Sequence, residues 1–167
     1  MFNKLLIIGC GLIGSSILRG CINKKISKKI FVFEKSKKNI SKIKKINSKI
    51  IILKKLDEKI SNIDIVIIST PMSQYEKIIP SLNKFLRKES IISDVGSTKQ
   101  NVLNLKNKKL NKSLDWISSH PISGSEVSGP EFGSKSLFLN KWCIIVKDKN
   151  TKKLKKMIQF WKKLGSK

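Results

Sequence analysis

Short apolar runs alternate along the chain with longer stretches in which apolar residues recur every three or four positions. Compact runs are typical of strands buried on both faces, and the longer spacing is typical of helices with one buried side. The runs predict strands at Lys4–Ile8, Ile30–Phe33, Ile50–Leu53, Asp64–Ser69, Ile91–Asp94, Trp116–Ser119 and Trp142–Val146.

The segments between these strands carry the helical pattern. Because strands separated by helices pair in parallel, we expect a doubly wound, mostly parallel α/β sheet, with ligands beyond the carboxyl ends of its strands. A Gly/Ser/Pro-rich loop is predicted at Ile122–Gly133. The predicted helices are Ile13–Cys21, Ser36–Ile46, Tyr75–Leu86, one that begins near Thr98, and Thr151–Leu164.

The net charge of +25 comes almost entirely from lysine, because only Arg19 and Arg87 of the 36 basic residues are arginine. The lysines are dispersed along the sequence, and the chain has no alanine, a pattern typical of AT-rich coding sequences. Arginine is the preferred residue for contacts with phosphates and bases. We therefore expect no nucleic-acid partner, although the positive field would favour acidic small molecules.

The three cysteines are odd in number and form no C-x-x-C pair, and the chain has one histidine. This composition fits a reducing cytosol and makes a metal site improbable. No apolar run is long enough to cross a membrane. The sequence therefore predicts a cytoplasmic protein with no bound metal and no membrane partner.

A glycine-rich loop follows the first predicted strand and opens the first predicted helix. In G-x-G-x-x-G loops the first glycine permits a tight turn, the second lets the backbone approach a pyrophosphate, and the third lets helix and strand pack closely. The helix N-terminus then offers N–H groups to the phosphates. We expect a Rossmann-type dinucleotide-binding domain in which the cofactor contacts Gly9, Gly11, Leu12, Ile13 and Gly14.

Glu34 lies 20 residues after the last glycine of this loop, at the end of the second predicted strand. A carboxylate there can accept hydrogen bonds from both adenosine ribose hydroxyls and would repel a 2′-phosphate. This favours NAD over NADP. The neighbouring Lys35, Lys37 and Lys38 could offset that repulsion, so NADP stays open.

Two further segments carry polar groups to the same edge of the sheet. One is Asp94-Val95-Gly96-Ser97-Thr98-Lys99, and the other runs from His120-Pro121 to Gly129 and contains the only histidine. With the G-x-G-L-I-G-x-S opening and the Ser69-Thr70-Pro71 turn, these motifs resemble the prephenate/arogenate dehydrogenases of tyrosine biosynthesis. The resemblance spans essentially the whole chain, including Trp161–Gly165.

That resemblance implies oxidative decarboxylation of prephenate or arogenate with NAD(P)+. His120 matches the family's catalytic histidine, and its ordinary pKa suits a group that accepts a hydroxyl proton. Ser97 matches a serine that hydrogen-bonds in the same site, and Glu126 a carboxylate near its mouth. The resemblance also implies that Ser69, Thr70, Pro71 and Asp94 contact the cofactor.

Structural roles are the alternative for several of these residues. His120 could be a hydrogen-bonded structural histidine at a strand end, and Ser97 could cap the helix that begins at Thr98. Lys99 is interpreted as a solvated or phosphate-facing charge. The tryptophans are expected in core or inter-domain packing, namely Trp116, Trp142 and Trp161.

The family resemblance also implies a helical second domain that supplies the dimer interface and the cationic residues for the substrate carboxylates. Gly165 is a candidate helix C-cap, and the chain stops where another strand would begin. We therefore expect residues 1–167 to be the dinucleotide-binding domain of a longer homodimeric protein. Two other functions stay open: another NAD(P) enzyme such as a β-hydroxyacid dehydrogenase or imine reductase, and a non-catalytic nucleotide-sensing module.

Overall fold

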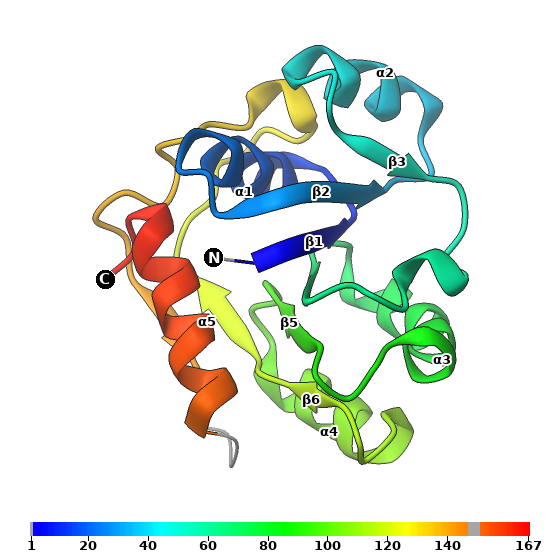
Figure 1. Cartoon of the computed structure of the whole chain (residues 1–167). Coiled ribbons are helices and arrows are strands. Elements are labelled where there is room, and N and C mark those ends of the chain that lie inside the picture. Colours follow the sequence, from blue (N-terminus) through cyan, green and yellow to red (C-terminus); the bar gives the residue numbers. More distant parts are fainter. Residues whose placement is uncertain (1, 147–150) are drawn as a thin grey trace.

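A computed structural model describes residues 2–146 and 151–167. Its main sheet has six parallel strands in the order β3-β2-β1-β4-β5-β6 (Figure 1). This order confirms the predicted doubly wound sheet. The strands are β1 (Phe2–Ile8), β2 (Ser27–Phe33), β3 (Ile51–Leu53), β4 (Ile65–Ile68), β5 (Ile91–Asp94) and β6 (Asp115–Trp116).

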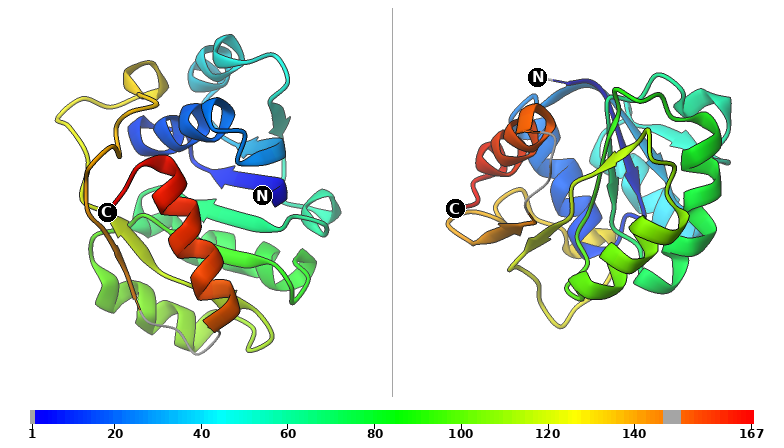
Figure 2. Two further views of the ribbon diagram at one scale, coloured as in Figure 1. Left: turned by 60° about the vertical axis from the view of Figure 1, so that its left-hand side comes forward. Right: turned by 90° about the horizontal axis from the view of Figure 1, so that it is seen from below.

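Helices cover both faces of this sheet. Figure 2 shows α1 and α5 on one side and α3 and α4 on the other. The helices are α1 (Leu12–Asn23), α2 (Lys37–Ile46), α3 (Tyr75–Phe85), α4 (Lys99–Lys109) and α5 (Thr151–Leu164), with short 3₁₀ turns η1 (Glu58–Ile60), η2 (Met72–Gln74) and η3 (Pro130–Phe132). The predicted helices are confirmed to within a few residues at each end.

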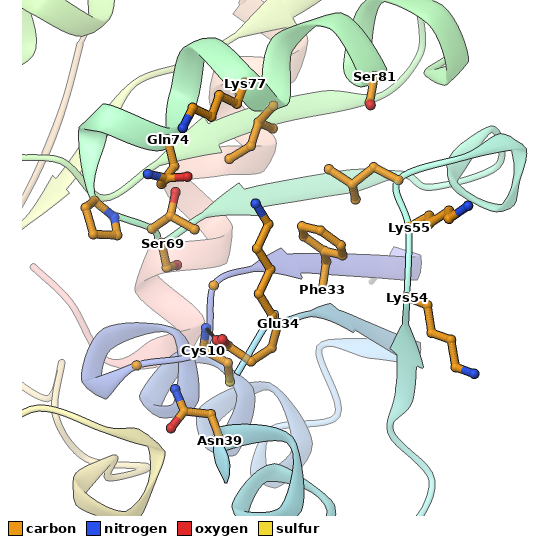
Figure 3. A pocket seen from close by; sticks show the side chains of 17 residues that line it. Cys10, Phe33, Glu34, Asn39, Lys54, Lys55, Ser69, Gln74, Lys77 and Ser81 are labelled. Atoms are coloured by element: carbon orange, nitrogen blue, oxygen red, sulfur yellow. Dashed lines mark hydrogen bonds between the residues drawn. The ribbon is translucent and has the colours of Figure 1, made fainter. Parts of the chain in front are cut away.

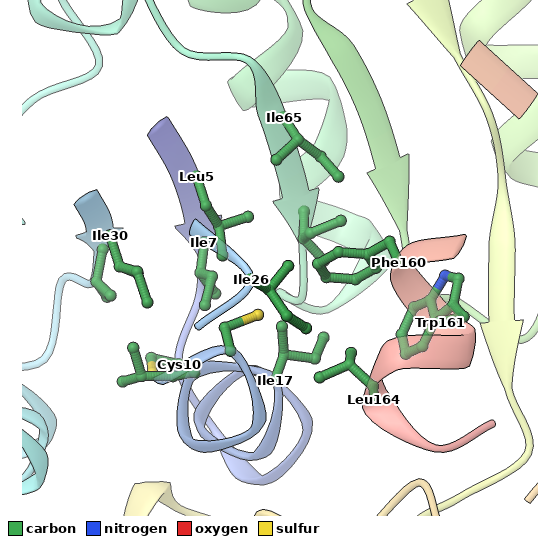
Figure 4. Packing of buried hydrophobic residues seen from close by; sticks show 14 of the residues in the cluster. Leu5, Ile7, Cys10, Ile17, Ile26, Ile30, Ile65, Phe160, Trp161 and Leu164 are labelled. Atoms are coloured by element: carbon green, nitrogen blue, oxygen red, sulfur yellow. The ribbon is translucent and has the colours of Figure 1, made fainter. Parts of the chain in front are cut away.

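Each face has its own core because side chains alternate along a strand. Leu5 and Ile7 of β1 belong to the core under α1, α2 and α5, whereas Leu6 and Ile8 belong to the core under α3 and α4. In the first core, Trp161 packs edge-on against its neighbour Phe160, with ring centroids 5.5 Å apart (Figure 4). The buried half of β1, Leu5–Ile8, is therefore apolar at every position, since both its faces are covered there.

One predicted strand is wrong in its extent. The segment Trp116–Ser119 does not form a single strand, because β6 ends at Trp116 and a separate strand, β7 (Ser119–Pro121), follows. The backbone of Ile117 still bonds to Ile92 of β5. Ser119 then donates from its buried hydroxyl to the carbonyl of Asp94, so a side chain replaces the ladder and the chain leaves the sheet.

The last predicted strand also lies outside the parallel sheet. It is β8 (Cys143–Ile145), which pairs antiparallel with β7 in a two-stranded sheet. No helix separates Pro121 from Cys143 except the short η3, so the chain can return directly and antiparallel.

The C-terminal end of α5 is capped as predicted. Gly165 has φ +100°, a conformation that favours glycine, and its N–H bonds to the carbonyl of Lys162. Lys167 then pairs with β8 through Lys141 and Cys143. Of the three tryptophans, Trp116 and Trp161 are buried, and Trp142 is 67 % exposed and lies outside both cores. None of the helices in the described part of the chain combines the length and apolar character needed to cross a membrane.

Candidate functional site

The glycine loop has the geometry that the motif predicts. Gly9 has φ +82° and donates from its N–H to Phe33 of β2 at 2.9 Å. A Cβ on Gly9 would lie 2.5 Å from Cγ2 of Thr70, and one on Gly14 would lie 2.3 Å from the carbonyl oxygen of Gly9. Both positions therefore require glycine, the first for conformation and contact, the second because α1 passes so close to the loop.

Gly11 differs from these two glycines, because a Cβ there would meet no protein atom within 4 Å. It is the N-cap of α1 and makes no side-chain cap hydrogen bond. The first N–H groups of α1, from Leu12 and Ile13 onwards, have no partner within the helix itself. Gly11 and the start of α1 therefore present open space and hydrogen-bond donors to an anionic group.

A cavity of about 670 Å³ opens beside this loop (Figure 3). Its wall comes from the ends of β1, β2, β3 and β4 and from η2 and α3. Six predicted cofactor residues line it: Gly9, Gly11, Glu34, Ser69, Thr70 and Pro71. Four others do not: Leu12, Ile13 and Gly14, which lie in α1, and Asp94, which lies at the end of β5.

Glu34 is fixed in this wall by two backbone groups. Its Oε2 accepts from the N–H of Cys10 at 2.9 Å, and its Oε1 accepts from the N–H of Ser36 at 2.9 Å. Figure 3 shows the carboxylate beside Cys10. Burial and the nearby Glu34 raise the pKa of the Cys10 thiol to about 12, so Cys10 stays a neutral packing group.

The cavity also contains residues that the motifs did not indicate. Lysines from two further segments, Lys54 and Lys55 after β3 and Lys77 on α3, line it together with Lys35, which lies beside Glu34. The sequence feature that could have indicated these lysines is their position, because each follows the end of a predicted strand or lies on α3. The additional lining residues are Cys10, Phe33, Asn39, Lys54, Lys55, Leu56, Gln74, Lys77, Ile78 and Ser81.

Two hydroxyl groups in the cavity wall test whether a polar ligand fits. Among the described residues, Oγ of Ser69 and Oγ1 of Thr70 are buried and have no hydrogen-bond partner. Buried hydroxyls are ordinarily bonded. Together with the open space at Gly11 and the carboxylate of Glu34, they fit a ligand that carries both phosphates and ribose hydroxyls.

His120 lies on β7, outside this cavity lining, directly opposite Ile144 of β8. Its side chain is half-buried. Burial lowers the pKa of the imidazole, the ammonium of Lys99 lowers it further, and Asp94 opposes them. The imidazole is therefore mainly neutral at pH 7 and able to accept a proton.

Asp94 and Lys99 form a buried ion pair behind β7. The carboxylate is fully buried and accepts from Nε1 of Trp116 and from the N–H of Gly96, both at 3.0 Å. Lys99 reaches it at 2.5 Å. The interpretation of Lys99 as a solvated or phosphate-facing charge is therefore wrong, because Asp94 draws the ammonium inward.

The alternative role of Ser97, as the cap of α4, is not found in the structure. Ser97 is exposed, α4 begins at Lys99, and Thr98 occupies the N-cap without a side-chain hydrogen bond. Glu126 is exposed on the loop that follows β7. Ser97 and Glu126, like His120, are not among the residues that line the cavity.

The end of that loop is fixed to α1. Arg19 donates to the carbonyl of Pro130 at 3.3 Å, and Ser16 accepts at its Oγ from the N–H of Ser134 at 3.0 Å. Gly133 packs against Ser15, where a Cβ would lie 2.1 Å from the hydroxyl. One helix therefore contacts both the cavity and the segment that follows His120.

Residues 2–146 and 151–167 contain no group of three or more His, Cys, Asp or Glu side chains that could hold a metal ion. A family model for the nucleotide-binding domain of prephenate dehydrogenase matches residues 19–167. The chain belongs to this family. The matched part includes Glu34, Asp94–Lys99 and His120–Gly129, and the glycine loop precedes it.

Prephenate dehydrogenases from two organisms resemble the chain in sequence. The one from Bacillus subtilis is 30 % identical over 154 residues, which is 92 % of this chain and 42 % of that protein. The one from Lactococcus lactis is 29 % identical over 147 residues, 87 % of this chain and 41 % of that protein. The chain spans less than half the length of these two relatives.

A crystal structure of prephenate dehydrogenase from A. aeolicus, in complex with hydroxyphenyl propionate and NAD+, has a similar fold. Its TM-score is 0.88 at 27 % sequence identity, and the match covers 100 % of this chain and 59 % of that one. The family's nucleotide-binding fold is thus present from end to end of this chain.

Proposed function

We propose that this chain is the dinucleotide-binding part of a dehydrogenase that uses NAD+ to decarboxylate prephenate or arogenate oxidatively. The observation that carries the proposal is the cavity, where a glycine loop, the start of α1 and the fixed carboxylate of Glu34 meet. The A. aeolicus relative was crystallised with NAD+, which supports the same cofactor here.

Each part of the cavity wall has a task in this proposal. The start of α1 at Gly11, Leu12 and Ile13 binds the pyrophosphate, and Glu34 accepts from the ribose hydroxyls. The unpaired hydroxyls of Ser69 and Thr70 bond to the nicotinamide half, beside Pro71. When bound, the nicotinamide accepts the hydride from the substrate carbon that bears the hydroxyl group.

His120 supplies the proton chemistry. As the substrate carbonyl forms, a neutral imidazole nitrogen of His120 takes the hydroxyl proton, and the ring carboxylate leaves as carbon dioxide. Ser97 hydrogen-bonds to the same hydroxyl or to the imidazole. Glu126 belongs to a polar network at the mouth of the site and does not take part in the chemical step.

The face of the β7–β8 sheet that carries His120 is apolar and uncovered. Residues paired across two strands project to the same side, which puts Ile144 beside His120 and Trp142 beside Ile122. These three apolar residues are 46–67 % exposed. We infer that a second, helical domain, corresponding to the part of the relatives that this chain does not span, covers this face and forms a homodimer in the cytoplasm.

The test is a calorimetric titration of the chain with NAD+ and NADP+, followed by prephenate- and arogenate-dependent NADH formation with the same protein. Saturable binding of NAD+ with little or no turnover is the expected result, because the substrate face is uncovered. Turnover by the chain alone would contradict the inferred need for a second domain. Failure to bind either nucleotide would overturn the proposed function.

A further inference from the structure

The ammonium of Lys99 is held at a junction between three parts of the fold. It lies on the first turn of α4, it pairs with Asp94 at the end of β5, and it donates to the carbonyl of Ser119 in β7 at 2.6 Å. Only 16 % of the Lys99 side chain is exposed, and none of Asp94. Burying a lysine this far is costly unless it is paired and hydrogen-bonded. The ion pair with Asp94 and the hydrogen bond to Ser119 therefore hold Lys99 in one position.

The carbonyl that Lys99 binds belongs to the residue immediately before His120. Ser119 is anchored from its side chain too, because its hydroxyl contacts Oγ of Ser93 at 2.6 Å and bonds to the carbonyl of Asp94 at 3.0 Å. The start of β7 is therefore fixed to β5 by the hydroxyl and to α4 by Lys99. The short β7–β8 pairing alone would fix it weakly.

We propose that Lys99 is a positioning residue for His120: its largely buried ammonium, held by Asp94, fixes the backbone of β7 and places a positive charge near the imidazole. Together with burial, that charge lowers the pKa of the imidazole and so favours the neutral form that can accept a proton. The value of this to catalysis rests on the proposed function, whereas the geometry and the charge effect do not.

Three titratable groups act on this corner of the molecule from three elements. Burial lowers the pKa of His120, Lys99 on α4 lowers it further, and Asp94 on β5 raises it. Cys143 on β8 lies beside the backbone of His120, and burial raises its pKa to about 12, so it carries no charge at neutral pH. Burial and Lys99 therefore act together to lower the pKa of His120, and Asp94 is the charged group that opposes them.

The experiment is an NMR titration of the imidazole in the 167-residue chain. His120 is the only histidine, so every imidazole signal belongs to it. The expected pKa is below 6.5. Lys99→Met should raise it by roughly half a unit or more, because the positive charge is lost and Asp94 stays, whereas Lys99→Arg should keep it near the original value.

The matched control is Lys108→Met, which removes the same charge from an exposed position on the same helix and should leave the pKa of His120 unchanged. Asp94→Asn should lower the pKa. If Lys99→Met does not fold, the Asp94→Asn, Lys99→Met double variant removes both buried charges and is compared with Asp94→Asn alone. A higher pKa in the double variant supports the proposal.

Equal pKa values in the folded Lys99→Met and original chains, or an equal rise in Lys108→Met, would overturn the proposal. These readings need no cofactor and no substrate. A chain that binds no dinucleotide can therefore still confirm the role of Lys99, and a chain that binds NAD+ can still contradict it.

Discussion

The cavity beside Gly11 is walled by the ends of four strands and by α3, whereas the face that carries His120 has Ile122, Trp142 and Ile144 exposed. In the cavity, the carboxylate of Glu34 is already held by two backbone N–H groups. Near His120, the chain supplies charged groups only behind β7, where Lys99 pairs with Asp94. The chain thus supplies a walled cavity for the proposed cofactor and leaves one face of the proposed reaction site uncovered.

The largest expected effect is on the rate of the reaction, and it comes from substituting His120. In any form of the chain that shows turnover, His120→Asn should lower kcat by about 10²–10⁴-fold, because the proton acceptor is lost. The affinity for NAD+, measured by calorimetry, should stay the same, because His120 does not line the cavity. An unchanged kcat would contradict the role of His120 as the proton acceptor.

A second substitution acts on the cofactor site alone. Gly11→Ala places a methyl group where no protein atom lies within 4 Å, so the thermal midpoint should hold while the Kd for NAD+ rises roughly tenfold or more. Gly124→Ala is the matched control, since it also adds a methyl group in open space, on the loop after β7. It should change neither quantity. Unaltered NAD+ affinity in Gly11→Ala would contradict the proposal that the pyrophosphate binds at this loop.

Glu34→Gln tests the proposed contact between Glu34 and the ribose hydroxyls in the cavity. The amide keeps the shape and one acceptor oxygen but loses the charge, so the Kd for NAD+ should rise by roughly three- to tenfold. Binding of NADP+ should improve relative to NAD+, because Lys35, Lys54 and Lys55 would no longer be opposed. An unchanged ratio of the two Kd values would contradict the ribose contact.

The smallest effect is a dependence of stability on pH at the reaction site. The pKa of His120 is lowered in the folded chain, so the unfolded chain binds more protons between that pKa and 6.5. Stability therefore falls as pH drops through this window. Thermal unfolding at pH 5 and 7 should show a slightly smaller acid loss in His120→Asn than in the original chain; an equal loss would contradict the lowered pKa.

Periodicity predicted most of the sheet because β1, β4 and β5 are buried on both faces and leave a dense apolar signal. It could not separate β6 from β7, since Ile117 continues the apolar run across the break. What ends β6 is the contact between Ser119 and Asp94, which are 25 residues apart. Spacing along the chain carries no information about such a contact.

The candidate site was predictable to a similar degree. Glycine geometry and Glu34 depend on local sequence, and the motif located them. The burial of Lys99 depends on a carboxylate that it meets only after folding, and one lysine among so many gave no sign of it. The lining residues Gln74 and Lys77 were missed for the same reason, because nothing in their own segment marks the inner side of α3.

Helix α1 meets the cavity at its N-cap, Gly11, and bonds along its side, through Ser16 and Arg19, to the segment at residues 130–134. One helix therefore touches both the cavity and the end of the loop that follows β7. Any change in the free energy of that segment that a bound nucleotide causes through α1 must be matched by an equal change in nucleotide affinity when the segment is restrained, because linkage is reciprocal.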